Sequence, residues 1–420
     1  MNDFLDGSVQ ETGNVVGDGV VHARRERLLD LLDFFFDQIG GGLSRYATDN
    51  DWLIPHFEKM LYDNALFIST LSEVYKITRK DLYKEAIEET LTFIEREMTH
   101  PNGGFYSAQD ADSEGVEGKY YVWSKSEIEN ALGKDTDLFN HFYGVLEAGN
   151  WETVNILWRK NDFEAFCSEN DLEVDSFKKK MKACREQLFE VRNTRIKPSL
   201  DDKMLLDWNA LMATAYAKAY SATKKIKYKE AAERNISFLL KNFQKEGNSF
   251  YHTYKDGKAQ YDAFLSDYAY LVEALIEIYF ITFNISYLNR ASELAEYVIS
   301  NFYDKKNHLF FFANENQTDL IIRKKETYDN ATPSGNSTMA HNLQRLGTLI
   351  GNENYRTIAR EMLLNIIATV EKYPTSFARW ANTIANEVHG IHEIAILGKD
   401  AKSWGTTINE WFVPNKVIMT

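Results

Sequence analysis

Two loops of this 420-residue chain combine titratable side chains in ways that could do acid–base chemistry. Residues 52–60 place His56 among bulky apolar groups directly before an apolar helical stretch. Residues 107–114 hold three carboxylates within five positions, including Asp110 and Asp112. Two carboxyls, or a carboxyl and an imidazole, can act as general acid and base on a sugar when a partly dry pocket separates their pKa values. These loops are therefore the first candidates for a catalytic site.

A third loop, residues 192–203, mixes arginines with carboxylates and leads into the pair Trp208-Asn209. We predict that Asp110 or Asp112 pairs with Asp202 as acid and base, with His56 nearby. Each loop has a plainer interpretation. His56 could be structural, the acidic loop could be solvated or bind Ca²⁺, and the third loop could be a salt-bridged surface.

Further polar and aromatic side chains are expected to position the hydroxyls and apolar ring faces of a substrate. Several of them share the first turn of an expected helix, where Asp, Asn and Ser are also ordinary capping residues. The tryptophans could equally belong to the core. The predicted substrate-binding residues are Trp52, Phe57, Glu58, Lys59, Asp63, Asn64, Arg195, Asp201, Lys203, Trp208, Asn209, Asp267, Tyr268, Ser334 and Asn336.

The elements that must position these side chains follow a repeat. Four apolar helical stretches, beginning near residues 63, 208, 268 and 336, are each followed by an amphipathic one that opens with a tyrosine. Tyr83 follows Leu66 by 17 residues, and the other three pairs are spaced by 17, 16 and 16 residues. The evenly apolar stretch is typical of an inner helix and the amphipathic one of an outer helix. Their N-terminal ends would then meet on one face.

The repeat predicts an all-α fold, an (α/α)6 toroid of helical hairpins, with short β-hairpins after the outer helices near residues 105, 250 and 309. Helical stretches near 125–143 and 161–191 fill the long gap between the first two repeats. An open α-solenoid is the alternative. We expect an atypical N-terminal segment at 1–23, the toroid at 24–385 with a helix near 24–37, and a C-terminal segment at 386–420 with a strand, a loop and a further extended stretch.

Composition excludes several classes of function. The net charge of −14 argues against a nucleic-acid partner, because phosphate binding needs a basic face. The first twenty residues lack the apolar core of a secretory signal, and the longest apolar run is interrupted by Glu273 and Glu277. The two cysteines, Cys167 and Cys184, are expected to be free thiols. We therefore expect a cytoplasmic protein without membrane contact, and we assign no cofactor and no metal ligand. Its oligomeric state is left open.

The same residues carry a family resemblance over roughly residues 34–345. The chain resembles the thioredoxin-domain-containing YyaL family in the ordered strings IGGGLSRYATDNDWLIPHFEKMLYDNA, GGFYSAQDADSEGVEGKYYVW, DDK and WN within DDKMLLDWNALM, FLSDYAYL and PSGNS. The resemblance implies a six-hairpin toroid similar to N-acylglucosamine 2-epimerases and six-hairpin glycosidases. The family's thioredoxin-like domain, with its CHWCH-type motif, is not present in this sequence, so redox activity is not expected of it.

Two hypotheses of function follow. The first is a carbohydrate-active enzyme, either a glycoside hydrolase or a sugar epimerase or isomerase, acting on a sugar-like small molecule in the centre of the toroid. The epimerase resemblance implies a pair of histidines; His56 lies in a matching motif, whereas His252 and His341 lie only near repeat positions. The second is a non-catalytic module that binds a metabolite or a partner. Carboxylates in a dry pocket favour the first, and carboxylates held in salt bridges favour the second.

Overall fold

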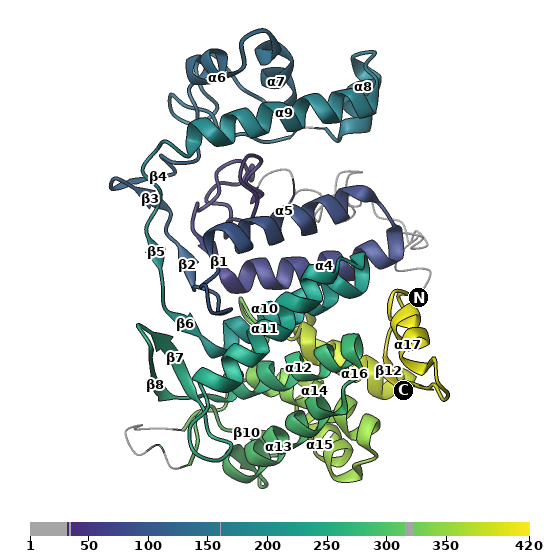
Figure 1. The fold of residues 1–420 in the computed structure, drawn as a ribbon. Helices are drawn as coiled ribbons and strands as arrows, with labels where there is room; N and C mark the ends of the chain where they lie inside the picture. Colours follow the sequence, from purple (N-terminus) through teal and green to yellow (C-terminus); the bar gives the residue numbers. More distant parts are fainter. Residues whose placement is uncertain (1–31, 33–34, 160, 316, 318–322) are drawn as a thin grey trace, which may run out of the picture.

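The computed structural model describes residues 32, 35–159, 161–315, 317 and 323–420. The predicted segment 1–23 and most of the predicted helix near 24–37 lie outside the described residues. The dominant feature is a set of four pairs of antiparallel helices (Figure 1). Their bounds are α4 Leu61–Thr78 with α5 Asp81–Glu97, α10 Leu206–Thr223 with α11 Ile226–Asn242, α12 Leu265–Thr282 with α13 Ile285–Phe302, and α14 Gly335–Ile350 with α15 Glu353–Lys372.

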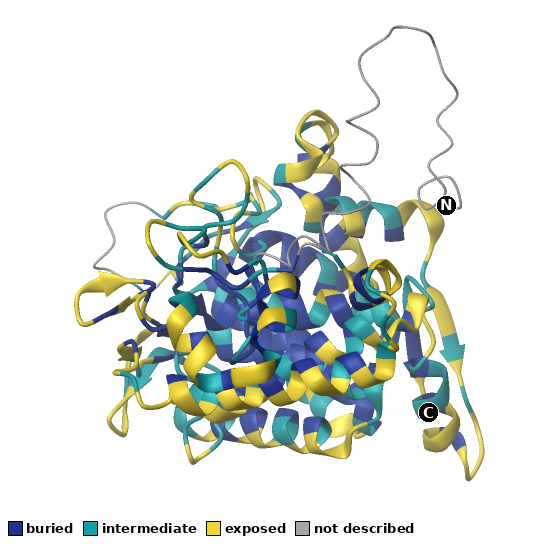
Figure 2. Ribbon diagram, turned by 90° about the horizontal axis from the view of Figure 1, so that it is seen from above, coloured by how far each residue is buried: buried dark blue, intermediate teal, exposed yellow. Residues whose placement is uncertain are grey.

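The first helix of each pair is an inner helix, as the sequence predicts. Inner helices pack in the order α4, α10, α12, α14 and then α16 (Ala378–His389). Helix α12 is buried on nearly all sides, whereas α5 and α13 bury one face. Seen from above, the buried residues fill the centre and the exposed ones lie outside (Figure 2). This burial explains why the inner sequences lack a polar stripe and the outer ones have one.

The four pairs share a loop geometry that fixes where each inner helix ends. Arg79, Lys224, Phe283 and Gly351 each adopt a left-handed conformation directly after their inner helix. The outer helix starts two residues later in every pair, and its tyrosine, such as Tyr83, is its third residue. A left-handed residue after the last turn is a common way to end a helix, so the repeat seen in the sequence is a repeat of these turns.

Four side chains, which we call the anchor residues, tie the first turns of α4, α10, α12 and α14 to an earlier segment of the chain. Asn64 Oδ1 accepts the backbone N–H of Leu43 at 2.8 Å, and Asn209 Oδ1 accepts that of Phe105 at 2.7 Å. The remaining two anchor residues act alike: Tyr268 Oη accepts Phe250 N–H at 3.0 Å, and Asn336 Oδ1 accepts Phe310 N–H at 2.7 Å. These N–H groups are buried, so without the anchor side chains they would have no hydrogen-bond acceptor.

The helices between the first two pairs form a lobe of their own. They are α6 Lys125–Leu132, α7 Thr136–Phe142, α8 Phe163–Glu169 and α9 Val174–Arg192, close to the predicted stretches. Their apolar residues, including Phe142 and Phe177, make a hydrophobic cluster separate from the main core. The lobe lies beyond α5 in Figure 1. These four helices therefore do not extend the row of inner helices.

Short strands join the helices near their N-terminal ends. Strand β2 (Ala108–Gln109) lies between β1 (Lys59–Met60) and β5 (Leu200–Asp201), and β7 (Tyr251–Lys255) lies between β6 (Met204–Leu205) and β8 (Lys258–Asp262). All four pairings are antiparallel. Two further hairpins pair β3 with β4 and β9 with β10, with bounds Asp112–Ser113, Val116–Glu117, Tyr303–Asp304 and Leu309–Phe310.

The C-terminal segment contains the two predicted extended stretches, β11 (His392–Ala395) and β12 (Lys416–Met419), which pair in parallel. Helix α17 (Ala401–Asn409) lies between them in place of the expected loop, because parallel strands need a crossover connection. Both cysteines are free, as predicted, and both are buried. No helix in the described part of the chain has the length and apolarity needed to cross a bilayer.

Candidate active site at the N-terminal ends of the inner helices

The carboxylates predicted to be catalytic lie at the protein surface. Asp110 and Asp112 are exposed, and Asp110 accepts a hydrogen bond from Ser199 Oγ at 2.9 Å. Asp202 forms an ion pair with Lys255 at 2.5 Å, and its side chain is 44% exposed. A charged group in contact with water keeps its ordinary solvation. The structure therefore does not give these three groups the partly dry pocket that their predicted acid–base role requires.

The third loop is held by ion pairs and backbone contacts. Asp201 lies 3.1 Å from Lys203, and both side chains are substantially exposed. Arg195 donates to the carbonyl oxygens of Tyr120 and Val122, and its guanidinium lies 4.0 Å from the Trp123 ring centroid. Arg195 thus joins the end of α9 to the loop before α6.

The first loop divides into two parts. His56 stacks on Tyr46 with ring centroids 5.2 Å apart, and its two nitrogens lie 3.9 Å from Glu58 and Glu117. Phe57 is buried against Tyr121. Glu58 pairs with Arg45 at 2.9 Å, which brings it toward the start of α4.

Lys59 is the centre of a buried structural network. Its Nζ lies 2.8 Å from both Asp37 Oδ2 and the Gly41 carbonyl, and 4.4 Å from the Phe93 ring centroid. Arg192 Nη1 contacts the other oxygen of Asp37 at 2.8 Å. Burial lowers the pKa of Lys59 to about 8 although Asp37 raises it. Burial raises the pKa of Asp37, but Arg192 and Lys59 outweigh this and hold it well below its usual range.

The remaining predicted binding residues also make contacts within the fold. Asn64, Asn209, Tyr268 and Asn336 are the anchor residues and are bonded to backbone groups. Ser334 caps α14 by accepting the Ser337 N–H. Trp52 packs on Phe35 with ring centroids 5.4 Å apart. Asp63, Trp208 and Asp267 are the predicted residues that come together with further polar groups at the N-terminal ends of the inner helices.

The first of these groups lies at the start of α4. Asp63 is half-buried, and burial raises the pKa of its carboxyl to about 7, with Arg45 lowering it and Glu58 raising it. The neighbouring Tyr62 accepts a hydrogen bond from Arg45 Nη2 at 3.1 Å. The Tyr62 ring meets Trp208, in the first turn of α10, edge to face with centroids 4.8 Å apart. A carboxyl that titrates near neutrality is suited to both giving and taking a proton.

The second group joins α10, β7 and α12. His252 Nδ1 lies 3.0 and 2.9 Å from the two oxygens of Asp267, which is fully buried. Asp267 Oδ1 also accepts the Asp207 N–H at 3.0 Å, and Oδ2 accepts the Phe264 N–H at 2.8 Å. Burial and the Asp267 charge raise the pKa of Asp207 to about 7. Burial lowers the pKa of His252, but the contact with Asp267 more than offsets this and brings it to about 9.

The pairing of β6 with β7 explains why this second group forms. Leu205 in β6 faces Thr253 in β7, so Asp207 and His252 lie close to the same rung of the sheet. Helix α12 follows β8 after two residues and brings Asp267 to the same place. Asp207 lies at the start of an expected inner helix, and His252 lies only near a repeat position. Arg45 and Tyr62 fall within the first string that carries the family resemblance, but nothing in the sequence indicated a role for either. Donor atoms of Asp207, His252 and Asp267 all lie within 4.8 Å of one another.

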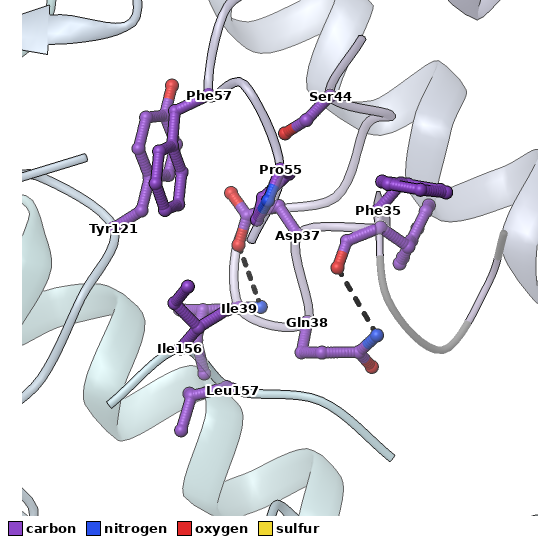
Figure 3. A pocket seen from close by; sticks show the side chains of 11 residues that line it. Phe35, Asp37, Gln38, Ile39, Ser44, Pro55, Phe57, Tyr121, Ile156 and Leu157 are labelled. Carbon is purple, nitrogen blue, oxygen red and sulfur yellow. Dashed lines mark hydrogen bonds between the residues drawn. The ribbon is translucent and has the colours of Figure 1, made fainter. Parts of the chain in front are cut away.

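Two cavities in the described part of the chain lie away from both of these groups. The cavity in Figure 3, between Phe35, Asp37 and Tyr121, has a volume of ≈ 30 Å³, room for only about one or two waters. A larger cavity of ≈ 390 Å³ lies between the outer helix α5 and α9 and is lined by charged residues such as Glu85 and Lys178. Neither cavity includes the groups on α10 and α12.

Comparison with solved structures identifies the class of fold. The chain is similar to a sugar epimerase from a ruminal bacterium, with a TM-score of 0.51 and 12% identity, covering 81% of this chain and 71% of that one. It is equally similar to cellobiose 2-epimerase from Bacillus thermoamylovorans, with a TM-score of 0.51 and 12% identity over 82% and 72% of the two chains. The protein therefore has the predicted (α/α)6-toroid type of fold, mostly helical with short strands in its loops.

Comparison of sequences gives closer relatives. The chain is 30% identical to spermatogenesis-associated protein 20 of Mus musculus over 423 residues, which is 91% of this chain and 54% of that protein. It is 28% identical to an uncharacterised protein of Caenorhabditis elegans over 94% of this chain and 56% of that one. The chain thus spans about half the length of these relatives. Residues 185–334 match the model of the N-acylglucosamine 2-epimerase family, and they include all of the second group.

Proposed function

We propose that the chain is a sugar-processing enzyme that moves a proton on a bound sugar, as an epimerase or isomerase does. The observation that carries this proposal is that the half-buried Asp63 directly follows Tyr62, whose ring contacts Trp208 where two inner helices begin. Sugars bind through aromatic side chains that cover their C–H faces and polar side chains that bond their hydroxyls. Both kinds of side chain occur at this point.

Each group has a distinct role in the proposal. Trp208 supplies the apolar surface, and the charged cluster of Asp207, His252 and Asp267 bonds hydroxyl or carbonyl oxygens. Asp63 takes the proton from one carbon and returns it to the neighbouring carbon, which is an isomerisation. An epimerisation would need a second group to return the proton to the opposite face of the same carbon. The pKa of Asp63, about 7, leaves its two protonation states similarly populated near neutral pH. The match of residues 185–334 to the N-acylglucosamine 2-epimerase family supports this reaction class over glycoside hydrolysis. Glycoside hydrolysis would need a second carboxyl at a suitable separation from Asp63. Asp110, Asp112 and Asp202 are too exposed to supply it. In this proposal Asp207 and Asp267 are held together with His252 and bond substrate oxygens.

A non-catalytic module that binds a metabolite is the second candidate. The observation in its favour is that the carboxylates of the third loop, Asp201 and Asp202, are held in ion pairs with lysines. This candidate predicts that a sugar or another metabolite binds without being converted.

The similarity to spermatogenesis-associated protein 20 also supports our proposal of membership in the YyaL family. Two buried free thiols fit a reducing compartment, so we propose a cytoplasmic location. The net charge of −14 supports the absence of a nucleic-acid partner.

The experiment is a thermal-shift screen against glucose, mannose, their N-acetylated 2-amino forms and cellobiose, because a ligand that binds only the folded state raises the melting temperature. We expect at least one sugar to raise it for the wild type and for Asp202→Asn, and not for Trp208→Ala. Absence of a shift with every sugar, or an equal shift in Trp208→Ala, would contradict the proposed site.

A further inference from the structure

We propose that Asp207, His252 and Asp267 form a binding site for one divalent first-row transition-metal ion. The three residues come from α10, β7 and α12, and their donor atoms lie within 4.8 Å of one another. The catalytic meaning of this ion rests on the proposed function, because the cluster adjoins the proposed sugar site. Binding of the ion itself does not depend on any sugar.

The distances within the cluster suit a shared ion. Nitrogen and oxygen ligands lie about 2.0–2.2 Å from such an ion, so neighbouring ligands are about 3.3 Å apart in a tetrahedral site and about 2.9 Å apart in an octahedral one. His252 Nδ1 is 2.9 Å from Asp267 Oδ2. Among the described residues, this is the group of histidines and carboxylates whose donor atoms converge closely enough to hold an ion. The three residues are placed by separate elements, each fixed by helix or sheet bonding, so the cluster is preorganised.

The charge of the cluster also calls for a cation. Elsewhere in the described chain, buried carboxylates have arginine partners: Asp37 has Arg192, Glu277 has Arg345, and Glu273 has Arg379. In the cluster, by contrast, the two carboxylates of Asp207 and Asp267 share one imidazole, that of His252.

Within the described residues, neither Asp207 nor Asp267 makes an ion pair with a lysine or arginine. Burying two carboxylates against one imidazole leaves negative charge uncompensated, which is costly unless a cation or a proton neutralises it. A divalent ion would supply the missing charge without any change of fold.

The donor set indicates the class of ion and its use. One imidazole with two carboxylates suits Zn²⁺, Co²⁺ or Mn²⁺, and three protein ligands leave coordination positions open for water or substrate. An ion held in this way can polarise a sugar oxygen and so make the neighbouring C–H more acidic. The proton would then move to Asp63, consistent with the proposed epimerase or isomerase chemistry.

The test is calorimetric titration of the chelator-treated protein with ZnCl₂, and in parallel with CoCl₂, followed by the visible absorption of bound Co²⁺. We expect one ion per chain for the wild type. Asp207→Asn and His252→Gln should each weaken binding by at least about tenfold and change the Co²⁺ spectrum. Circular dichroism checks that each variant is folded; Asp207→Asn keeps the helix contacts of Asp267 and serves if His252→Gln does not fold.

The matched controls are Asp112→Asn, an exposed carboxylate, and His308→Gln, a histidine whose side chain is 42% exposed and pairs with Glu361 at 3.0 Å. Both should bind the ion like the wild type. Failure of the wild type to bind either ion at one per chain, or equal affinity in Asp207→Asn and wild type, would overturn the metal site. Repeating the thermal-shift screen with sugars in the presence of chelator separates the two proposals. If the ion binds but no sugar raises the melting temperature, the metal site stands and the proposed function fails.

Discussion

Tyr62 and Trp208 meet edge to face at 4.8 Å between ring centroids, and this contact joins the first turns of two neighbouring inner helices. Asp63 directly follows Tyr62 in α4, and burial raises the pKa of its carboxyl to about 7. A partly buried carboxyl and an aromatic contact occur together at this end of the helices, whereas the carboxylates of the surface loops are exposed. The predictions below follow from it and from the network that supports it.

Trp208→Ala should weaken sugar binding by at least about tenfold while the protein stays folded, because the side chain is half-buried and its truncation removes the apolar surface. Calorimetric titration with a sugar found by thermal shift measures this. Trp404→Ala is the matched control, since that tryptophan is 61% exposed on α17. Equal loss in both variants would show that the effect is not specific to Trp208.

Asp63→Asn should make the protein more stable at pH 8. The pKa of Asp63 is raised from 3.8 to about 7 in the folded state, so the folded protein holds an extra proton between about pH 4 and pH 7. Stability therefore falls as pH rises through that window. Removing the charge should gain about 1–3 kcal/mol at pH 8, discounted for partial exposure, and little at pH 4. Urea unfolding at both pH values measures this, and Asp110→Asn should show no such difference.

Asp37→Asn should lower the free energy of unfolding by about 3–5 kcal/mol, because it leaves Lys59 and Arg192 as buried cations without their anion. Acid should act in the same direction. The pKa of Asp37 is depressed in the folded state, so its stabilisation is present above the unfolded value of 3.8 and is lost as pH falls below it. Urea unfolding of Asp37→Asn beside Asp162→Asn, an exposed helix cap, gives the comparison. A loss no larger than that of Asp162→Asn would contradict the role of the network.

Asn209→Ala should destabilise the fold by about 2–4 kcal/mol, because it removes the acceptor of the buried Phe105 N–H and the donor to two carbonyl groups. Asn193→Ala, at an exposed position after α9, should change stability by less than about 0.5 kcal/mol. Chemical denaturation measures both. If Asn209→Ala leaves the free energy of unfolding almost unchanged, the anchor residues are not required by the fold.

The helix pairs could be predicted from the sequence because they depend on local patterning. The spacing from Leu66 to Tyr83 recurs, with a change of at most one residue, because the inner helix of each of the four pairs ends in the same left-handed turn. Anchor residues such as Asn209 were visible as a repeated first-turn polar position, but their bonds to the preceding chain were not. The bond of Asn209 spans 104 residues, and those of the other three anchor residues span 18 to 26 residues.

The candidate site was harder to predict for the same reason. Asp63, Trp208 and Asp267 were expected to bind substrate, which the structure leaves as a proposal. His252 reaches Asp267 only because β7 pairs with β6 and folds back toward α12. The ion pair between Asp202 and Lys255 also depends on this sheet, and no sequence motif predicts that pair. Long-range pairing therefore decides which carboxylates are buried and which are exposed.

The central claim is that this chain moves a proton on a bound sugar. The most direct measurement is proton NMR of each binding sugar incubated with the protein in D₂O, with and without ZnCl₂. The account predicts that one sugar loses the signal of the hydrogen beside its carbonyl or anomeric carbon as deuterium enters, with an epimer or isomer appearing, and that Asp63→Asn abolishes both. Sugars that bind yet exchange no hydrogen and form no epimer or isomer under either condition would contradict it and leave the non-catalytic module as the function.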